Sequence, residues 1–569
     1  MYLNSLVKIP DVPGKIVKKN KAGTIYVEYE YNRTYDPKKQ YTNVKRATIG
    51  KQSPDDCNMM WPNQNLLKYF PGTELPELEN STSRSSCLHV GSNIVINKIF
   101  DDYKLDTFLG KYFDGKDLGL IQDLVAYTII CENNAGQYYP DYAYNHALRT
   151  PRMRIYSDST VSDFLKSVTA DQRIGFLNSW NEVRDHREKI YISYDSTNKN
   201  CQAGDLNIVE FGHPKVEKGL PVFNYAIAYD TDNKEPLFYE EYPGSINDVA
   251  QFKYMVEKAS GYGYRKIGFI LDRGYFSKAN ISCMDEHGYD FILMVKGMYS
   301  LVRELVKSVK GSFENIRKNS IREFKLYGTT VERKLFETDD STRYFHIYYS
   351  DSKGGSEREA LEAKIEKLSK FLKSKEFQTK TEFSGIFENY FDLIYDPNDG
   401  MFLGAVEKAG VIEEELGLCG YFVLVTSKKM TAKEAVMLYK SRDASEKLFR
   451  GDKSYLGNKS IRVYSDEAAS AKIFIEFIAL IIRSKIYTYL KEESIRTASR
   501  QNYMTVPAAL KELEKIEMIR SLDGNYRLDH AITATQKAIL NAFGIDDSYI
   551  KRHALMLNGM LTASDNSNS

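Results

Sequence analysis

The middle of the chain alternates between apolar and polar residues in several short segments, which is the pattern of β-strands. Residues 189–194 alternate and end on Asp195. Further strands are predicted at 208–212, 223–230 and 237–242. Because short connections join these segments, we expect them to form an antiparallel meander.

A crossover then leads to an apolar strand that ends on a second aspartate. After Pro243 and Gly244, a helix is predicted from about residue 247 to 259, with Ser245 or Asn247 as its N-cap. The following segment KIGFILD is almost wholly apolar, as expected of a parallel strand covered on both faces, and it ends on Asp272. A short helix at 276–287 and a fifth strand at 291–297 follow. The order predicts an α/β fold with a ribonuclease-H-like mixed sheet flanked by helices.

Four polar residues near position 440 have a spacing that places them on one side of a helix. Tyr439, Arg442, Glu446 and Lys453 fall within a stripe about 60° wide when each residue turns the helix by about 100°. A carboxylate, a phenol and two cations are poorly suited to a hydrophobic core, but they suit a metal ion beside a phosphodiester. A solvated charged face is the alternative interpretation.

Carboxylates at the sheet favour chemistry that depends on a hard metal ion. Asp272 lies at the carboxyl end of a buried strand, where open α/β sheets place their ligands. Magnesium prefers oxygen ligands, and a phosphodiester supplies more of them, so two or three protein carboxylates suffice. Two such ions about 3.5–4 Å apart can hold the attacking and leaving oxygens of an in-line displacement. Asp195 and Asp272 are therefore candidate metal ligands.

Several motifs resemble those of the DDE transposases of the insertion-sequence-four family, in the branch with long proteins. The family signature Y-x2-R-x3-E-x6-K stands here as YKSRDASEKLFRGDK (439–453). LDRGYF (271–276) resembles the second-aspartate motif, and YDSTN (194–198) resembles the first, together with the later segments 212–230 and 238–248. The similarity extends from residues 26–51 to residues 461–482 and so covers most of the chain.

The resemblance implies a catalytic triad of Asp195, Asp272 and Glu446 that binds two Mg²⁺ ions, for which Mn²⁺ would substitute. Tyr439, Arg442 and Lys453 would bind DNA phosphates.

The implied reaction is cut-and-paste transposition: the enzyme would bind the terminal inverted repeats of an insertion sequence, cut the double-stranded DNA and join it to target DNA. A homodimer would hold the two ends in a synaptic complex.

Gly451 lies between Glu446 and Lys453 in the predicted helix. Glycine is a poor helix former and weakens a helix there by roughly 0.5–1 kcal/mol relative to alanine.

The interval between Asp272 and Glu446 is far longer than a ribonuclease-H-like sheet needs, so an insertion is expected. Within it, strands are predicted at about 323–350, 389–396 and 421–427, and a helix at about 356–374. Residues 303–334 carry nine Lys or Arg against four Glu, which favours either a solvated surface or a contact with DNA.

A chain of 569 residues exceeds a single core and is expected to form three or more domains. We expect a small basic β module at 1–60, a helical DNA-end-binding region at 90–185, a catalytic core at 186–300 and 428–490, an insertion domain at 301–427, a helical C-terminal region at 491–562 for dimerisation or as a winged helix, and a disordered tail at 563–569. The net charge is only +1, but residues 1–51 hold eleven Lys or Arg against four Asp or Glu. The β module is therefore expected either to contact DNA phosphates or to pack as a basic hairpin.

No signal peptide is expected. No membrane helix is expected either, because Glu476 and Arg483 interrupt the most apolar helix, at 467–495. The six cysteines have the spacing of neither a zinc site nor a secreted disulfide framework, and without a signal peptide we expect a bacterial cytoplasmic protein. Two alternatives to an active transposase stay open. One is a domesticated or inactive DNA-binding protein, and the other is a structure-selective nuclease on the same core.

Overall fold

A computed structural model defines the fold of the chain. It describes residues 6–21, 23–38, 40–75, 84–132, 134–184, 188–201, 206–212, 220–296, 298–339, 341–443, 460–498, 501–521 and 523–567. The chain forms two compact units, Leu177–Gly451 and a second unit that joins Met1–Phe176 to Asp452–Ser569. Each unit is described by itself.

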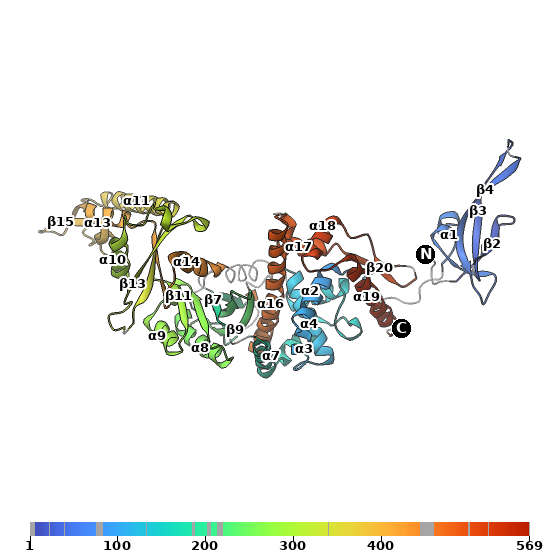
Figure 1. The fold of residues 1–569 in the computed structure, drawn as a ribbon, viewed down its shortest axis with the longest axis horizontal. Helices are drawn as coiled ribbons and strands as arrows, with labels where there is room; N and C mark the ends of the chain where they lie inside the picture. The colour runs from blue at the N-terminus through green and yellow to red at the C-terminus, as the bar shows by residue number, and fades with distance from the viewer. Residues whose placement is uncertain are drawn as a thin grey trace. The chain divides into compact units, whose positions relative to one another are not determined.

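The unit Leu177–Gly451 is built on a mixed sheet whose central strands follow the order β9-β8-β7-β10-β11 (Figure 1). These strands are β7 (Ile190–Cys201), β8 (Val222–Asp230), β9 (Glu235–Pro243), β10 (Ile267–Leu271) and β11 (Asp290–Met294). The first three form an antiparallel meander, while β10 runs parallel to both β7 and β11. This arrangement confirms the predicted α/β fold with a ribonuclease-H-like mixed sheet.

Two helices make the crossovers between the parallel strands. They are α8 (Asp248–Gly261) and α9 (Lys278–Glu286). Asn247 caps α8, as predicted, because its side chain accepts a hydrogen bond from the backbone N–H of Ala250. The residues of α8 that are buried recur at helical spacing: Phe252, Met255, Val256 and Ala259. This apolar stripe explains why the helix packs onto the sheet.

Two strand predictions need correction. Residues 208–212 do not form a strand, and only Glu210 makes an isolated bridge to Val222. Both edges of β8 are already paired, with β7 on one side and β9 on the other, so the sheet offers this segment no place. Strand β7 also does not end at Asp195 but continues to Cys201.

The insertion continues the same sheet. Beyond β11 the strand order is β17-β14-β13-β12, and all of these strands are antiparallel to their neighbours. They are β12 (Ser320–Ile321), β13 (Leu326–Arg333), β14 (Arg343–Tyr349) and β17 (Tyr421–Thr426). The segments EFKLYG and TVERKLF, expected to be two strands, contribute the single long strand β13.

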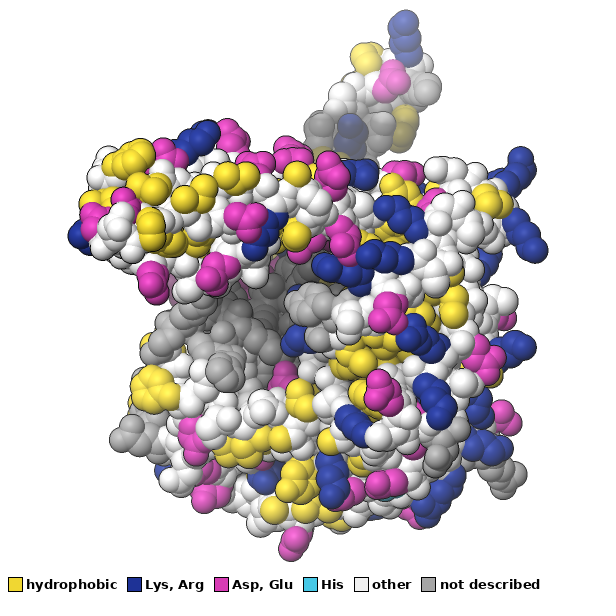
Figure 2. Space-filling view, turned by 90° about the vertical axis from the view of Figure 1, so that its left-hand side faces the viewer, with side chains coloured by type: hydrophobic (Ala, Val, Ile, Leu, Met, Phe, Trp, Pro, Cys, Tyr) yellow, Lys and Arg dark blue, Asp and Glu magenta, His cyan; other side chains and the backbone are white. Residues whose placement is uncertain are grey.

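The outer part of the insertion has a small core of its own. This outer part contains α10 (Tyr299–Val309), α11 (Asp351–Lys373), α12 (Ile386–Tyr390), β15 (Phe391–Tyr395), β16 (Phe402–Glu407) and α13 (Ala409–Leu416). Ile365 and Leu372 of α11 pack with Phe391 and Phe402 of the two-stranded sheet, so the predicted apolar stripe of this helix is intramolecular. The space-filling view toward this end shows further hydrophobic side chains exposed among charged ones (Figure 2).

The second unit begins with a five-stranded antiparallel sheet of order β1-β5-β4-β3-β2. Its strands are β1 (Val7–Lys8), β2 (Ile16–Lys21), β3 (Thr24–Asp36), β4 (Tyr41–Gln52) and β5 (Met59–Pro62), followed by α1 (Gln64–Tyr69). Val27, Ile49, Met60 and Leu66 are fully buried and form the core between the sheet and α1.

The rest of this unit is mainly helical. Its helices are α2 (Gly91–Asp102), α3 (Leu105–Leu109), α4 (Gly115–Ile130), α5 (Tyr139–Asn145), α6 (Asp158–Ser167), α16 (Asp466–Arg496), α17 (Val506–Leu513), α18 (Ala534–Asn541) and α19 (Asp547–Ser567), and α7 (Ala170–Glu182) crosses the boundary between the units. Helix α16 packs against α4 and α6. Helix α19 extends into the segment expected to be disordered from residue 563. Among the described helices, none combines the length and the apolar content that a membrane span needs.

A three-stranded sheet joins residues from opposite ends of the sequence. Strand β19 (Glu517–Arg520) pairs with β20 (Tyr526–Leu528) on one side and with β6 (Cys87–His89) on the other. The β19–β20 hairpin follows α17.

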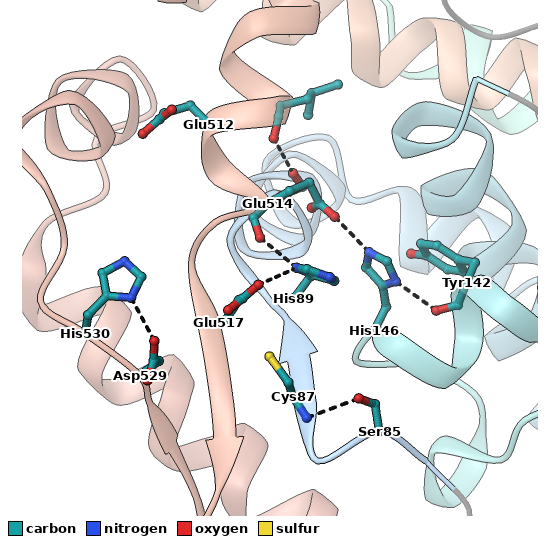
Figure 3. A network of polar contacts seen from close by, with 12 residues as sticks. Ser85, Cys87, His89, Tyr142, His146, Glu512, Glu514, Glu517, Asp529 and His530 are labelled. Atoms are coloured by element: carbon teal, nitrogen blue, oxygen red, sulfur yellow. Dashed lines mark hydrogen bonds and ion pairs between the residues drawn. The ribbon is translucent and has the colours of Figure 1, made fainter.

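Two histidines, His89 and His146, lie beside the sheet that joins the two ends of the sequence (Figure 3). The Nε2 atom of His146 lies 2.8 Å from Glu514 Oε2, and its Nδ1 atom lies 2.8 Å from the carbonyl oxygen of Tyr142. The His146 ring thereby links the end of α5 to the Glu514 carboxylate at the end of α17. Burial by itself raises the pKa of Glu514, but the hydrogen bond and the charge of His146 outweigh burial and hold this pKa below its ordinary value.

We predict that His146→Ala lowers the free energy of unfolding of this unit by about 1–3 kcal/mol, because the Glu514 carboxylate loses its charged partner. Urea denaturation of the full chain, followed by circular dichroism at neutral pH, measures the change. Because the pKa of Glu514 is lowered in the folded protein, its charged carboxylate stabilises the fold at pH values above the ordinary carboxyl pKa. This stabilisation is lost as the pH falls from the ordinary carboxyl pKa through the lowered pKa of the folded state.

The matched control is His530→Ala. His530 pairs with Asp529 at 3.3 Å, but the two side chains are 43% and 45% exposed. Removing this pair should change the free energy of unfolding by less than about 0.5 kcal/mol. Equal losses in the two variants would contradict a structural role for the His146–Glu514 pair.

Candidate active site

Helix α14 (Ala432–Ser441) carries one side of the candidate site. Thr431 and Glu434 form a capping box at its N-terminus, which satisfies two backbone N–H groups and fixes where the helix begins. One face of the helix, Ala432, Ala435, Val436 and Tyr439, packs on buried residues of the sheet. The spacing of these residues is that of an apolar helical stripe, so the packing sets the rotation of α14.

Arg442 follows Tyr439 on the same side of α14 and reaches the sheet beside Asp272. Its Nη1 atom lies 2.9 Å from Asp272 Oδ1, and the two side chains are 14% and 44% exposed. The guanidinium carbon lies 5.1 Å from the centre of the Tyr439 ring, a cation–π distance. Tyr439 is 6% exposed, so its ring supports Arg442 from within the core.

Asp195 and Asp272 lie side by side because two parallel strands are in register. Leu271 of β10 is the partner of Tyr194 of β7, and each aspartate is the next residue of its chain. Neighbouring strands are about 4.8 Å apart, and paired residues of a sheet point to the same face. Asp272 caps a short 3-10 helix, and its Oδ1 atom accepts a hydrogen bond of 2.7 Å from the backbone N–H of Arg273. The Ser196 N–H donates to Asp195 Oδ1 at 2.8 Å.

Two buried tyrosines, Tyr275 and Tyr242, lie near the acidic residues of this region, and sequence reasoning missed them. Burial raises the pKa of Tyr275 well above its ordinary value, and the charges of Asp248 and Asp195 raise it further, so this hydroxyl stays neutral beside them. The Tyr242 hydroxyl donates a hydrogen bond of 2.6 Å to Asp248 Oδ1. Tyr275 belongs to the LDRGYF segment, and Asp248 ends FYEEYPGSIND, so the motif segments contained the signal.

The donor atoms present fit a divalent cation in part. Both recorded contacts of the Asp272 carboxylate fall on Oδ1, and Oδ2 has no hydrogen-bond or ion-pair partner among the described residues. Two adjacent carboxylates supply the oxygen ligands that Mg²⁺ prefers. Within the described ranges, no group of three or more His, Cys, Asp or Glu is placed to hold a metal. Glu446 and Lys453 lie outside the described residues.

The structure thus brings four of the six predicted site residues to one edge of the sheet: Asp195, Asp272, Tyr439 and Arg442. The ion pair between Arg442 and Asp272 also reduces the repulsion between the two carboxylates, because the guanidinium offsets the charge of one acid. Chemically, two carboxylates beside an arginine can hold a divalent cation and a phosphate together.

Comparisons with known proteins point to one class. No curated protein matches the chain. A solved structure of the piggyBac transposase synaptic complex with hairpin DNA is similar over 82% of this chain and 85% of that chain, with 9% sequence identity and a TM-score of 0.36. A TM-score this low does not establish a shared fold.

The family model described as the transposase DDE domain matches residues 195–482, which is more than half of the chain. The match begins at Asp195 and includes Asp272 and Arg442, the residues that the sheet and α14 bring together. The chain belongs to the transposase DDE domain family.

Proposed function

We propose that this transposase belongs to the insertion-sequence-four family and moves its element by cut-and-paste transposition. It binds the terminal inverted repeats, cuts the DNA and joins the freed ends to target DNA, with the two ends held by a homodimer. The observation that carries the proposal is the register of β7 and β10, which aligns Asp195 with Asp272, together with Arg442 at 2.9 Å from Asp272.

The proposed metal ligands are Asp195, Asp272 and Glu446, which would hold two Mg²⁺ ions, or Mn²⁺ in their place. Bound there, the ions would stabilise the charge of an attacking and a leaving oxygen at a phosphodiester. Asp195 is held on a central strand and Asp272 at a strand end, so both carboxylates are positioned by the sheet before DNA arrives. Preorganised charge of this kind needs little rearrangement during the reaction.

The proposed phosphate-binding residues are Tyr439, Arg442 and Lys453. The planar guanidinium of Arg442 offers paired N–H donors that match phosphate oxygens, and one of its nitrogens, Nη1, lies 2.9 Å from Asp272 Oδ1. Because Tyr439 is largely buried, its part in phosphate binding is limited to its hydroxyl and to the support of Arg442.

We predict that Asp272→Asn lowers cleavage of element-end DNA by about 10³-fold or more while leaving DNA binding unchanged, since the amide is a poor metal ligand of the same shape. Labelled duplexes taken from both sides of the gene, incubated with the full chain and Mg²⁺, report cleavage on sequencing gels. Binding to the same duplexes is measured without divalent metal.

Asp392→Asn is the matched control, because this side chain is 70% exposed on β15 of the insertion. It should cleave as the wild type does. Persistent cleavage by Asp272→Asn would refute the proposed site. Binding without cleavage by the wild type would instead support a DNA-binding protein that does not transpose.

A second prediction concerns the competition between Arg442 and a metal ion for Asp272. Arg442→Ala removes the cation that contacts Oδ1 in the metal-free state, so Mn²⁺ should bind about three- to tenfold more tightly; the change is modest because Asp272 is partly exposed to solvent. Cleavage should nevertheless fall, because the phosphate loses its arginine. Electron paramagnetic resonance of free Mn²⁺ measures the affinity.

Arg273→Ala controls for the loss of one positive charge near the site, since the exposed Arg273 contacts Asp272 through its backbone N–H rather than its side chain. Its Mn²⁺ affinity should stay within about twofold of the wild type. Equal Mn²⁺ affinities of Arg442→Ala and the wild type would show that the ion pair does not compete with the metal.

A further inference from the structure

The hairpin of β3 and β4 extends beyond the rest of the N-terminal sheet as a two-stranded ribbon, residues 31–46 (Figure 1). Strand β2 pairs with β3 only as far as Tyr29, and β5 pairs with β4 only from Gly50 to Gln52. Over the ribbon, β3 and β4 therefore pair with each other alone. Its register runs from Asn32 opposite Lys45 to Asp36 opposite Tyr41.

The ribbon has no apolar core of its own. Among its described residues only Asp36 and Val44 are partly buried, and all the others are exposed. Tyr35 and Tyr41 are 60% and 52% exposed. An isolated two-stranded hairpin is marginally stable in water, so a projecting ribbon of this kind is typical of a surface that acquires a partner.

The cross-strand pairs divide the ribbon into two faces, because successive residues of a strand point to opposite sides. The pairs Asn32–Lys45, Thr34–Asn43 and Asp36–Tyr41 lie on one face. We call the first four of these residues, Asn32, Lys45, Thr34 and Asn43, the amide face. None of the four side chains has a hydrogen-bond or ion-pair partner among the described residues, so their donors and acceptors face solvent. The pairs Arg33–Val44 and Tyr35–Thr42 lie on the opposite face.

An ion-pair clamp fixes the base of the ribbon. Glu30 is 3% exposed and accepts hydrogen bonds from Arg33 Nε at 2.8 Å and from Arg46 Nη2 at 2.6 Å. These hydrogen bonds lower the pKa of Glu30, so the clamp stays charged at neutral pH. Arg33 also donates to the carbonyl oxygen of Gly14 at 3.1 Å, which ties the ribbon to the loop before β2. The ribbon is thereby held in one direction before any partner binds.

The charge and the width of the ribbon indicate which kind of partner it binds. With Glu30, which pairs with Arg33 and Arg46, residues 30–46 hold five Lys or Arg and two acidic residues, and this excess of positive charge attracts a polyanion. Two strands about 4.8 Å apart with their side chains fit the major groove of duplex DNA, about 12 Å wide, and not the minor groove, about 6 Å wide. Asparagine and threonine are side chains that read base edges there, by hydrogen bonds to adenine and other bases.

We propose that the ribbon enters the major groove of duplex DNA and that Asn32, Thr34 and Asn43 of the amide face contact base edges. This inference rests on the proposed function, and it adds a sequence-reading element that lies outside the helical region expected to recognise the ends. The excess of Lys and Arg supplies phosphate contacts that position the ribbon without reading sequence.

The test uses the full chain without divalent metal, so cleavage cannot interfere. A pool of random-sequence 40-bp duplexes is selected for binding, and the affinity of the recovered duplex is measured for the wild type, for Asn43→Ala and for Thr42→Ala. Residues 42 and 43 are neighbours on opposite faces of the same strand, so Thr42→Ala is the matched control. Interference by dimethyl sulfate then locates the contact, since guanine N7 lies in the major groove and adenine N3 in the minor groove.

Asn43→Ala is expected to lose about tenfold in affinity for the selected duplex and to lose interference at one tract of guanine N7 positions, while Thr42→Ala keeps both. Lys45→Ala should weaken binding to all duplexes and lower the salt dependence by about one ion. The proposal is overturned if Asn43→Ala selects and binds the same sequences as the wild type, if the ribbon-dependent interference falls on adenine N3, or if single strands of the same length bind better. Failure of the proposed function appears separately, as absent cleavage by the wild type with Mg²⁺.

Discussion

The parallel pairing of β7 with β10 is the constraint on which the candidate site depends. It aligns Leu271 with Tyr194 and so brings two acidic residues from distant parts of the sequence next to each other. Two adjacent carboxylates repel each other unless a cation lies between or beside them. Arg442 supplies that positive charge at Asp272.

The position of Arg442 depends in turn on the insertion. Strands β17 and β14 extend the catalytic sheet, and α14, which begins directly after them, packs across β10, β11 and the inserted strands. The Tyr348 hydroxyl of β14 donates a hydrogen bond of 2.7 Å to the carbonyl oxygen of Ala432 at the start of α14. His346 bridges Thr330 and Thr426 inside the sheet, and burial lowers its pKa to about 4, so the ring is neutral. The insertion is therefore part of the frame that holds the site.

The charge of this protein is organised locally. A net charge of +1 gives no indication of a nucleic-acid partner, yet the ribbon of residues 31–46 is strongly basic and its amide face is open to solvent. The catalytic edge of the sheet instead combines acids with one arginine. A cationic, exposed ribbon and an acidic, partly buried site place opposite demands on side chains, and the chain meets them in separate compact units.

The sequence by itself determined the local features. Alternation and apolar runs located β7, β8, β9, β10 and β11, because side-chain periodicity directly reflects the pleat and the buried faces. The same reasoning placed Tyr439 and Arg442 on one side of a helix, since the spacing of residues fixes their angle about the axis.

Only the tertiary structure decided how these elements combine. Residues 208–212 have the pattern of a strand but no free sheet edge to pair with, and the inserted strands join the catalytic sheet although their sequence is equally compatible with a separate domain. The contact between Arg442 and Asp272 and the effect of the Asp195 charge on Tyr275 likewise depend on packing between segments that are far apart in the chain. A local pattern specifies which face of an element is apolar, but it does not specify which other element covers that face.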